Sequence, residues 1–106
     1  MALVTEHFPL LRCLAQGRNI SDIKKKADKK LVTCLCECVL NILRGNVPLT
    51  DRERNTLKRY RKTLRALIDK KVSLKQKKKA LEQKGGSAIL RSVCSAVVKK
   101  WNTQEK

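Results

Sequence analysis

A segment that is both strongly basic and regularly apolar, residues 52–84, constrains the fold of this chain more than any other feature. It holds fourteen Lys and Arg residues against three acids, Glu53, Asp69 and Glu82. Apolar residues nevertheless recur along it at the i, i+3, i+7, i+10 and i+11 spacing of one helical face: Leu57, Tyr60, Leu64, Leu67 and Ile68. A disordered basic tail lacks such a face, so the segment is expected to fold into helices that hold their cations on an outer surface.

Local start signals divide this basic segment into two helices. Thr50 with Glu53 and Ser73 with Gln76 have the spacing of capping boxes, in which the first residue accepts from the third helical N–H and the side chain three positions on bonds back. The first box predicts a helix over residues 51–69. The second predicts a helix over residues 74–84, followed by two glycines.

The composition favours helices for the rest of the chain as well. The 106 residues suffice for one small domain, 42% of them are apolar, and there are only two prolines and four glycines. With one Phe, one Tyr and one Trp, the core must be built from aliphatic residues and Cys. The remaining expected helices cover residues 6–16, 22–28 after an N-cap at Ser21, 29–44 after an N-cap at Asp28, and 88–101. The predicted fold class is all-α, a compact single domain of five or six short helices around residues 31–43.

We expect a basic helical domain over residues 1–87, a C-terminal amphipathic helix over 88–101 that docks on it, and a disordered end over 102–106. The stripe that would dock has helical spacing and consists of Leu90, Val93, Cys94, Val97, Val98 and Trp101. One alternative remains open at this point: the double glycine could act as a hinge and leave this helix free for another partner.

The five cysteines, Cys13, Cys34, Cys36, Cys38 and Cys94, do not form a metal-binding pattern. Zinc usually takes four ligands from two separate pairs, whereas this chain has no C-x-x-C and a single histidine, His7. An odd number with three in five positions is also unlike a secreted disulfide scaffold. We therefore expect buried free thiols in a reducing intracellular compartment, no metal and no cofactor. A metal site or an intermolecular disulfide is the weaker alternative.

No motif in the sequence indicates catalysis. There is no P-loop, no nucleophile elbow and no cluster of carboxylates. Cys13 and His7 could pair, but no third group is available to orient them. We expect a non-enzymatic protein without catalytic residues.

The net charge of +17 favours a polyanionic partner. Like charges one turn apart, such as Arg54 with Lys58 and Lys58 with Lys62, destabilise a helix, and several such pairs suggest a functional contact. Because aromatics for base stacking are scarce, duplex DNA backbone is the expected target. The expected nucleic-acid-binding residues are Arg52, Arg54, Lys58, Arg59, Arg61, Lys62, Arg65, Lys75, Lys78 and Lys79. The cluster between Lys24 and Lys30 is the alternative site.

Three runs of the sequence, LCECVLNILRGNVPLT, KTLRALIDKKVSL and EQKGG, lie within residues 35–86. Over this half, the chain resembles a family of small basic proteins from Polinton- or Maverick-type DNA elements and related animal viruses. These proteins have been likened to the adenovirus minor core protein X. The resemblance implies a helical protein that associates with DNA or with the particle. Relatives often follow Q-K-G-G with a more apolar tail, whereas the tail here is shorter and carries Arg91, Lys99 and Lys100.

The leading functional hypothesis is therefore a basic helical protein that binds or condenses nucleic acid, as a viral or mobile-element core component in the nucleus or the virion. The alternative is a membrane-active or particle-interaction protein that acts through its C-terminal amphipathic helix on an anionic membrane or on particle proteins. An acidic protein partner is a third possibility.

Overall fold

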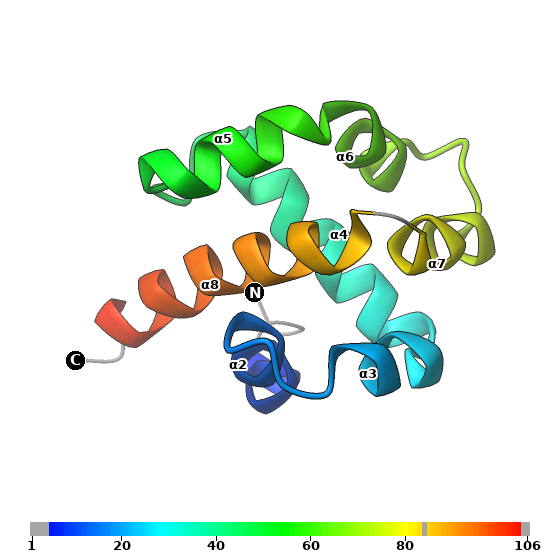
Figure 1. The fold of residues 1–106 in the computed structure, drawn as a ribbon, viewed down its shortest axis with the longest axis horizontal. Coiled ribbons are helices and arrows are strands. Elements are labelled where there is room, and N and C mark those ends of the chain that lie inside the picture. The colour runs from blue at the N-terminus through cyan, green and yellow to red at the C-terminus, as the bar shows by residue number, and fades with distance from the viewer. Residues whose placement is uncertain (1–4, 84, 105–106) are drawn as a thin grey trace.

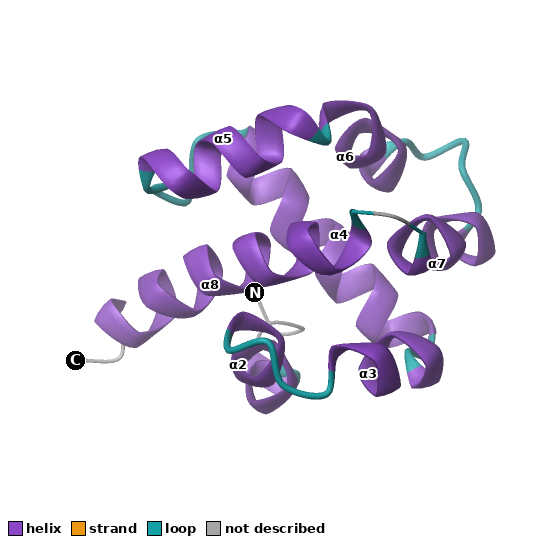
Figure 2. Cartoon of the chain, in the orientation of Figure 1, coloured by secondary structure: helices purple, strands orange, loops and turns teal. Residues whose placement is uncertain are grey.

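The computed structural model describes the backbone of residues 5–83 and 85–104, and the side chains of that part as far as residue 100. Its helices are joined by short loops (Figures 1 and 2). They are α2 (Phe8–Ala15), α3 (Ile20–Lys26), α4 (Lys29–Leu43), α5 (Asp51–Arg59), α6 (Arg61–Ile68), α7 (Leu74–Glu82) and α8 (Gly86–Gln104). The described residues contain no strand. The all-α prediction is confirmed, with seven labelled helices rather than five or six.

The additional helix arises because the helix expected over residues 51–69 is interrupted at Tyr60. This residue has φ −106° and ψ 29°, and its N–H donates to the Leu57 carbonyl at 3.2 Å, three residues back, so the α-helical ladder is broken there. The interruption redirects the chain: α5 packs on α8, whereas α6 packs on α4 and α7. The apolar face is kept across the break, with Leu57, Leu64 and Leu67 buried.

Helices α4 and α8 cross in the middle of the molecule and share its core (Figure 1). The sequence placed α4 alone at the centre, but α8 packs on four helices, α2, α4, α5 and α7. Both are apolar around much of their circumference, which suits helices covered from several sides. Leu43, the last residue of α4, lies at the edge of this core and is 49% exposed.

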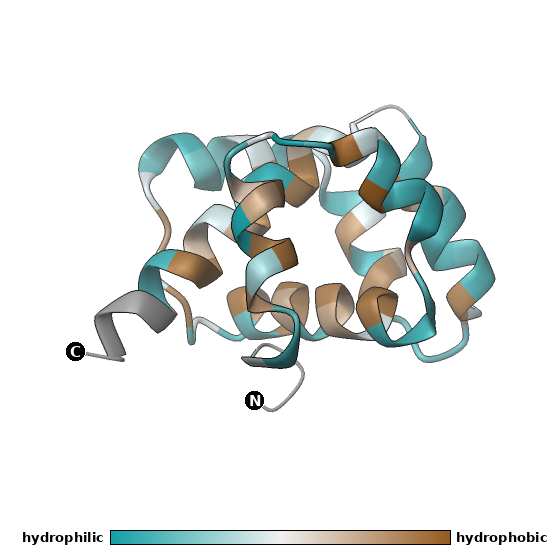
Figure 3. Cartoon of the chain, turned by 90° about the horizontal axis from the view of Figure 1, so that it is seen from below, coloured by the Kyte–Doolittle hydropathy of each residue, from teal (hydrophilic) through white to brown (hydrophobic). Residues whose placement is uncertain are grey.

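Figure 3 colours the chain by hydropathy and shows apolar stretches, in brown, on the helices around the centre of the molecule. In α8 the buried residues include Ile89, Leu90, Val93, Cys94 and Val97, all at most 2% exposed. Helix α8 is thus a structural part of the domain and begins at Gly86. Its backbone continues as a helix through Gln104, beyond the end expected at residue 101. Residues 105–106 and the Trp101 side chain lie outside what the structure describes.

The N-termini of the helices show which capping signals in the sequence predicted a helix start correctly. Both capping boxes form: the Thr50 hydroxyl accepts from Glu53 N–H at 3.1 Å, and the Ser73 hydroxyl accepts from Gln76 N–H at 3.2 Å. Asp28 caps α4 by accepting from Leu31 N–H at 2.8 Å. Ser21 is not a cap, because α3 begins at Ile20 after Asn19 in the left-handed region at φ +53°, a conformation that Asn tolerates better than most residues.

Candidate nucleic-acid interface

Seven of the ten expected contact residues lie on α5 and α6. All seven are exposed, because Leu57, Leu64 and Leu67 take the inner side of the same helices. We call this surface the α5–α6 face; it comprises Arg52, Arg54, Lys58, Arg59, Arg61, Lys62 and Arg65. At the interruption of the two helices, Lys58, Arg59, Arg61 and Lys62 line a shallow surface hollow of about 220 Å³. The interruption therefore gathers four cations around a concave spot that a straight helix would lack.

The other three expected residues, on α7, lie beside the lysines of α3. Helices α3 and α7 pack together, and the Lys78 ammonium donates to the Lys25 carbonyl at 3.0 Å. The Lys24 ammonium donates to the Ser87 hydroxyl at 3.0 Å. We call this surface the α3–α7 ridge; it comprises Lys24, Lys25, Lys26, Lys75, Lys78 and Lys79.

The structure thus divides the ten residues between two surfaces. Helix α7 packs on α6 as well as on α3, so the ridge adjoins the α6 end of the α5–α6 face, whereas α5 packs on α8 and α6. The alternative site named from the sequence, between Lys24 and Lys30, contributes its first three lysines to the ridge. The sequence shows these three lysines as consecutive positive charges, but no local pattern indicates that α3 packs beside α7.

Few of these cations are neutralised within the protein. In the described part of the chain, no lysine or arginine of α3, α6 or α7 forms an ion pair. On α5, Arg54 lies 3.9 Å from Asp51, and both side chains are mostly exposed, so the pair is weak. Two nearby acids act on the backbone instead: Asp69 accepts from Lys71 N–H at 2.9 Å, and Asp28 caps α4.

Glu53 is the one buried charged residue in the described core, at 7% exposure. One carboxylate oxygen accepts from Thr50 N–H at 2.9 Å and the other lies 3.0 Å from the Lys99 ammonium. Burial alone would raise the pKa of Glu53, but the bonds from Thr50, Lys99 and Ser95 outweigh it and hold the pKa below its ordinary value. Glu53 therefore joins α5 to α8 and does not neutralise the α5–α6 face.

Four of the five cysteines lie in the core or pack against it: Cys34, Cys36, Cys38 and Cys94. Cys34, Cys38 and Cys94 are buried, Cys13 and Cys36 are half-buried, and all five are free thiols. Cys38 and Cys34 are hydrogen-bonded; this bond, with burial, raises the pKa of the Cys38 thiol, and burial raises the pKa of Cys94. Neutral buried thiols act as small apolar groups. The described residues contain no group of three His, Cys, Asp or Glu that could hold a metal ion.

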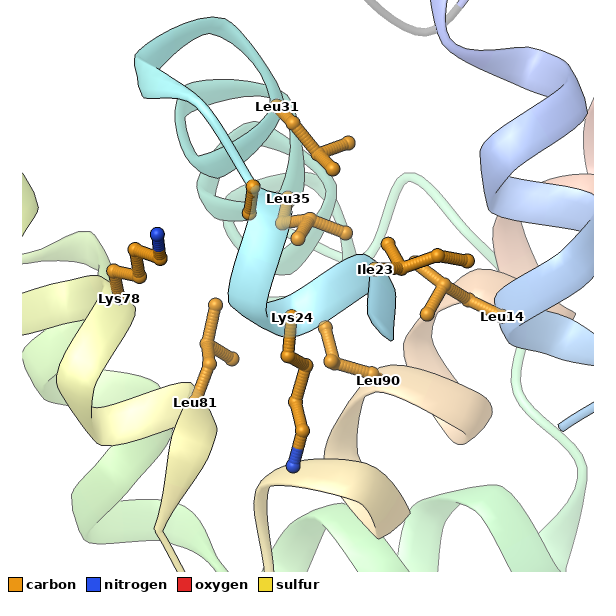
Figure 4. Close-up of a pocket in the computed structure, with 9 residues that line it drawn as sticks. Leu14, Ile23, Lys24, Leu31, Leu35, Lys78, Leu81 and Leu90 are labelled. Carbon is orange, nitrogen blue, oxygen red and sulfur yellow. The ribbon is translucent and has the colours of Figure 1, made fainter. Parts of the chain in front are cut away.

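Beneath the α3–α7 ridge is a small gap lined mainly by leucines, including Leu14, Leu31, Leu35, Leu81 and Leu90 (Figure 4). Its volume is about 10 Å³, which is at most the size of one water molecule. Lys24 and Lys78 border it with their aliphatic stems, and the Lys24 ammonium points away from the leucines (Figure 4). The ridge is therefore an outer surface on a packed core, not the rim of a ligand pocket.

Within the residues that the structure describes, no helix is long and apolar enough to cross a membrane. Comparisons with protein-family models, with curated proteins and with solved structures found no match to this chain.

Proposed function

We propose that this chain is a non-enzymatic nucleic-acid-binding protein that contacts the phosphate backbone, mainly of duplex DNA, through the α5–α6 face and the α3–α7 ridge. The observation that carries the proposal is the set of mostly exposed cations on α3, α5, α6 and α7, of which only Arg54 forms an ion pair in the described part of the chain. The cations on such a surface repel one another, and bound phosphates neutralise that repulsion. The counterions that the polyanion releases on binding contribute a further favourable term.

The chemistry of the two surfaces favours backbone contact over base recognition. The α5–α6 face carries arginines, whose planar forks fit phosphate oxygens in pairs. The ridge is made of lysines, which act as point charges. Tyr60 is half-buried against the core, so it offers little for base stacking. Binding is therefore expected to be largely independent of sequence, which is suited to condensing DNA.

On the sequence resemblance alone, we extend the proposal to a core component of a virus or mobile element that acts in the nucleus or the virion. The alternative is a membrane-active or particle-interaction protein that works through α8. The burial of Ile89, Leu90, Val93 and Val97 favours the first proposal, because α8 would have to leave the core before its apolar side could meet a membrane.

The test is a salt titration of binding to a fluorescently labelled duplex. If about six phosphates are neutralised, the logarithm of the affinity should fall with the logarithm of salt at a slope of roughly −5. Vesicles of neutral lipid, measured in parallel, should not bind. Binding to neutral vesicles together with a shallow salt dependence on the duplex would reject the proposal in favour of the membrane alternative.

A further inference from the structure

Helices α2 and α5 pack on α8 from two sides and leave an open cleft above one polar side of α8. The cleft has a volume of about 600 Å³, and its floor is built from Ser87, Ala88, Arg91, Ser92 and Ser95 of α8. The beginning of α5 forms one wall, and the end of α2 with the beginning of α3 forms the other. This volume is in the range of pockets that hold nucleotide-sized ligands.

The cleft is positively charged. Arg52 and Arg91 line it, and neither guanidinium makes a hydrogen bond or an ion pair in the described part of the chain. The single carboxylate that lines it, Glu53, is neutralised by Lys99 at 3.0 Å. The first turn of α8 also borders the cleft and brings the positive end of the helix dipole to it.

Arg91 is exposed, but its side chain lies close to one wall of the cleft. A Cβ added at Gly17 would lie 3.4 Å from Cζ of Arg91, so the guanidinium rests against the turn that follows α2. It therefore extends from the floor on α8 to one wall, while Arg52 stands on the other. Thr56 of α5 and Ser92 of α8 add hydroxyl groups to the lining of the cleft.

We propose that this cleft binds a phosphate group between Arg52 and Arg91. Two guanidinium groups from different helices can each donate a pair of bonds to phosphate oxygens, and the hydroxyls of Thr56 and Ser92 can donate to the remaining oxygens. Arg52 also belongs to the α5–α6 face, whereas Arg91 and Ser92 belong to neither that face nor the α3–α7 ridge. Changes at Arg91 therefore test this site separately from the proposed nucleic-acid binding.

The site can be tested with inorganic pyrophosphate at constant ionic strength, followed through the backbone amide signals in NMR. Signals of Thr56, Ser92 and Ser95 should shift saturably. Arg91→Gln should weaken binding about tenfold, as for the loss of one charge-assisted pair of bonds, whereas Arg44→Gln, an exposed arginine outside the cleft, should not weaken it. Thr56→Val keeps the side-chain shape and should weaken binding by a smaller factor, so the test survives if Arg91→Gln fails to fold.

Two duplexes that differ only in a 5′-phosphate distinguish the source of the phosphate group. Tighter binding of the phosphorylated duplex, lost in Arg91→Gln, identifies the end of a nucleic acid. Equal binding of both duplexes, with saturable binding of pyrophosphate, identifies a free phosphate compound. Shifts confined to the α3–α7 ridge, or equal pyrophosphate affinity in Arg91→Gln and Arg44→Gln, would overturn the site while leaving the DNA-binding proposal standing.

Discussion

Glu53 stabilises the fold through two separate contacts of its carboxylate. Its carboxylate completes the capping box of α5 and pairs with Lys99 of α8, so it fixes one helix against the other. Its pKa lies below the ordinary value of 4.5 in the folded protein. The resulting stabilisation is therefore fully present above about pH 4.5 and is lost as the pH falls through the folded-state pKa.

We expect Glu53→Gln to destabilise the protein at neutral pH by about 1–3 kcal/mol, since it leaves the Lys99 ammonium without its buried carboxylate. The variant should also lose part of the acid sensitivity of the wild type. Urea denaturation between about pH 3 and about pH 7 measures both effects. Asp51→Asn is the matched control, because the Asp51 side chain is 98% exposed and its pair with Arg54 is weak. Parallel pH curves for Glu53→Gln and wild type would contradict the assignment.

Cys38 and Cys36 give a paired test of the packing interpretation on a single helix. Cys38 is fully buried, whereas Cys36 is half-buried. Cys38→Ser puts a hydroxyl among apolar neighbours and should cost about 1–3 kcal/mol; Cys36→Ser should cost clearly less. Urea denaturation gives the stabilities, and elemental analysis gives the metal content, which neither change should alter. Stoichiometric zinc that disappears in either variant would refute core packing as their role.

Among the helices, sequence reasoning succeeded where the determinants are local. The capping boxes at Thr50 and Ser73 and the cap at Asp28 involve residues three positions apart, so their spacing alone identifies them. It failed at Tyr60, where the helix is interrupted so that α5 can pack on α8 while α6 packs on α4 and α7. It also could not place α3 beside α7, because no local pattern encodes which helices pack together. Nine of the ten expected contact residues are exposed and Lys78 is half-buried. Their division between two surfaces was not foreseen.

Tyr60 and Gly85 connect the interruption to the start of α8. Gly85 has φ +89°, and the Tyr60 ring leaves no room for a Cβ there. Gly45 has a similar φ of +79° but nothing within 4 Å of an added Cβ. We expect Gly45→Ala to cost about 1 kcal/mol, from backbone strain alone, and Gly85→Ala to cost about 2–4 kcal/mol. Chemical denaturation provides the comparison, and the two costs should converge in a Tyr60→Ala background. Equal costs in the wild-type background would mean that the ring contact does not matter.

The net charge of the chain is +17, and its described residues form few ion pairs. The stability of the protein and its binding to DNA should therefore depend on salt in opposite directions. Added salt screens the repulsion between exposed cations, so the free energy of unfolding should rise. The same salt should weaken binding to DNA. Denaturation midpoints that fall between about 50 mM and about 500 mM sodium chloride would show that attractive pairs dominate the fold instead.

Three double variants of equal net charge decide whether DNA contact belongs to the two named surfaces or to the charge as a whole. Arg59→Ala with Lys62→Ala removes cations of the α5–α6 face, and Lys26→Ala with Lys79→Ala removes cations of the α3–α7 ridge. Arg12→Ala with Arg44→Ala removes exposed cations outside both surfaces. If phosphates lie along the two surfaces, each of the first two pairs should flatten the log-log salt slope of duplex binding by about two units, while the third leaves it nearly unchanged. Stability should hold or rise slightly in all three, because each relieves repulsion. Equal losses of affinity and slope in all three variants would mean that total charge, and not its placement on these helices, determines binding.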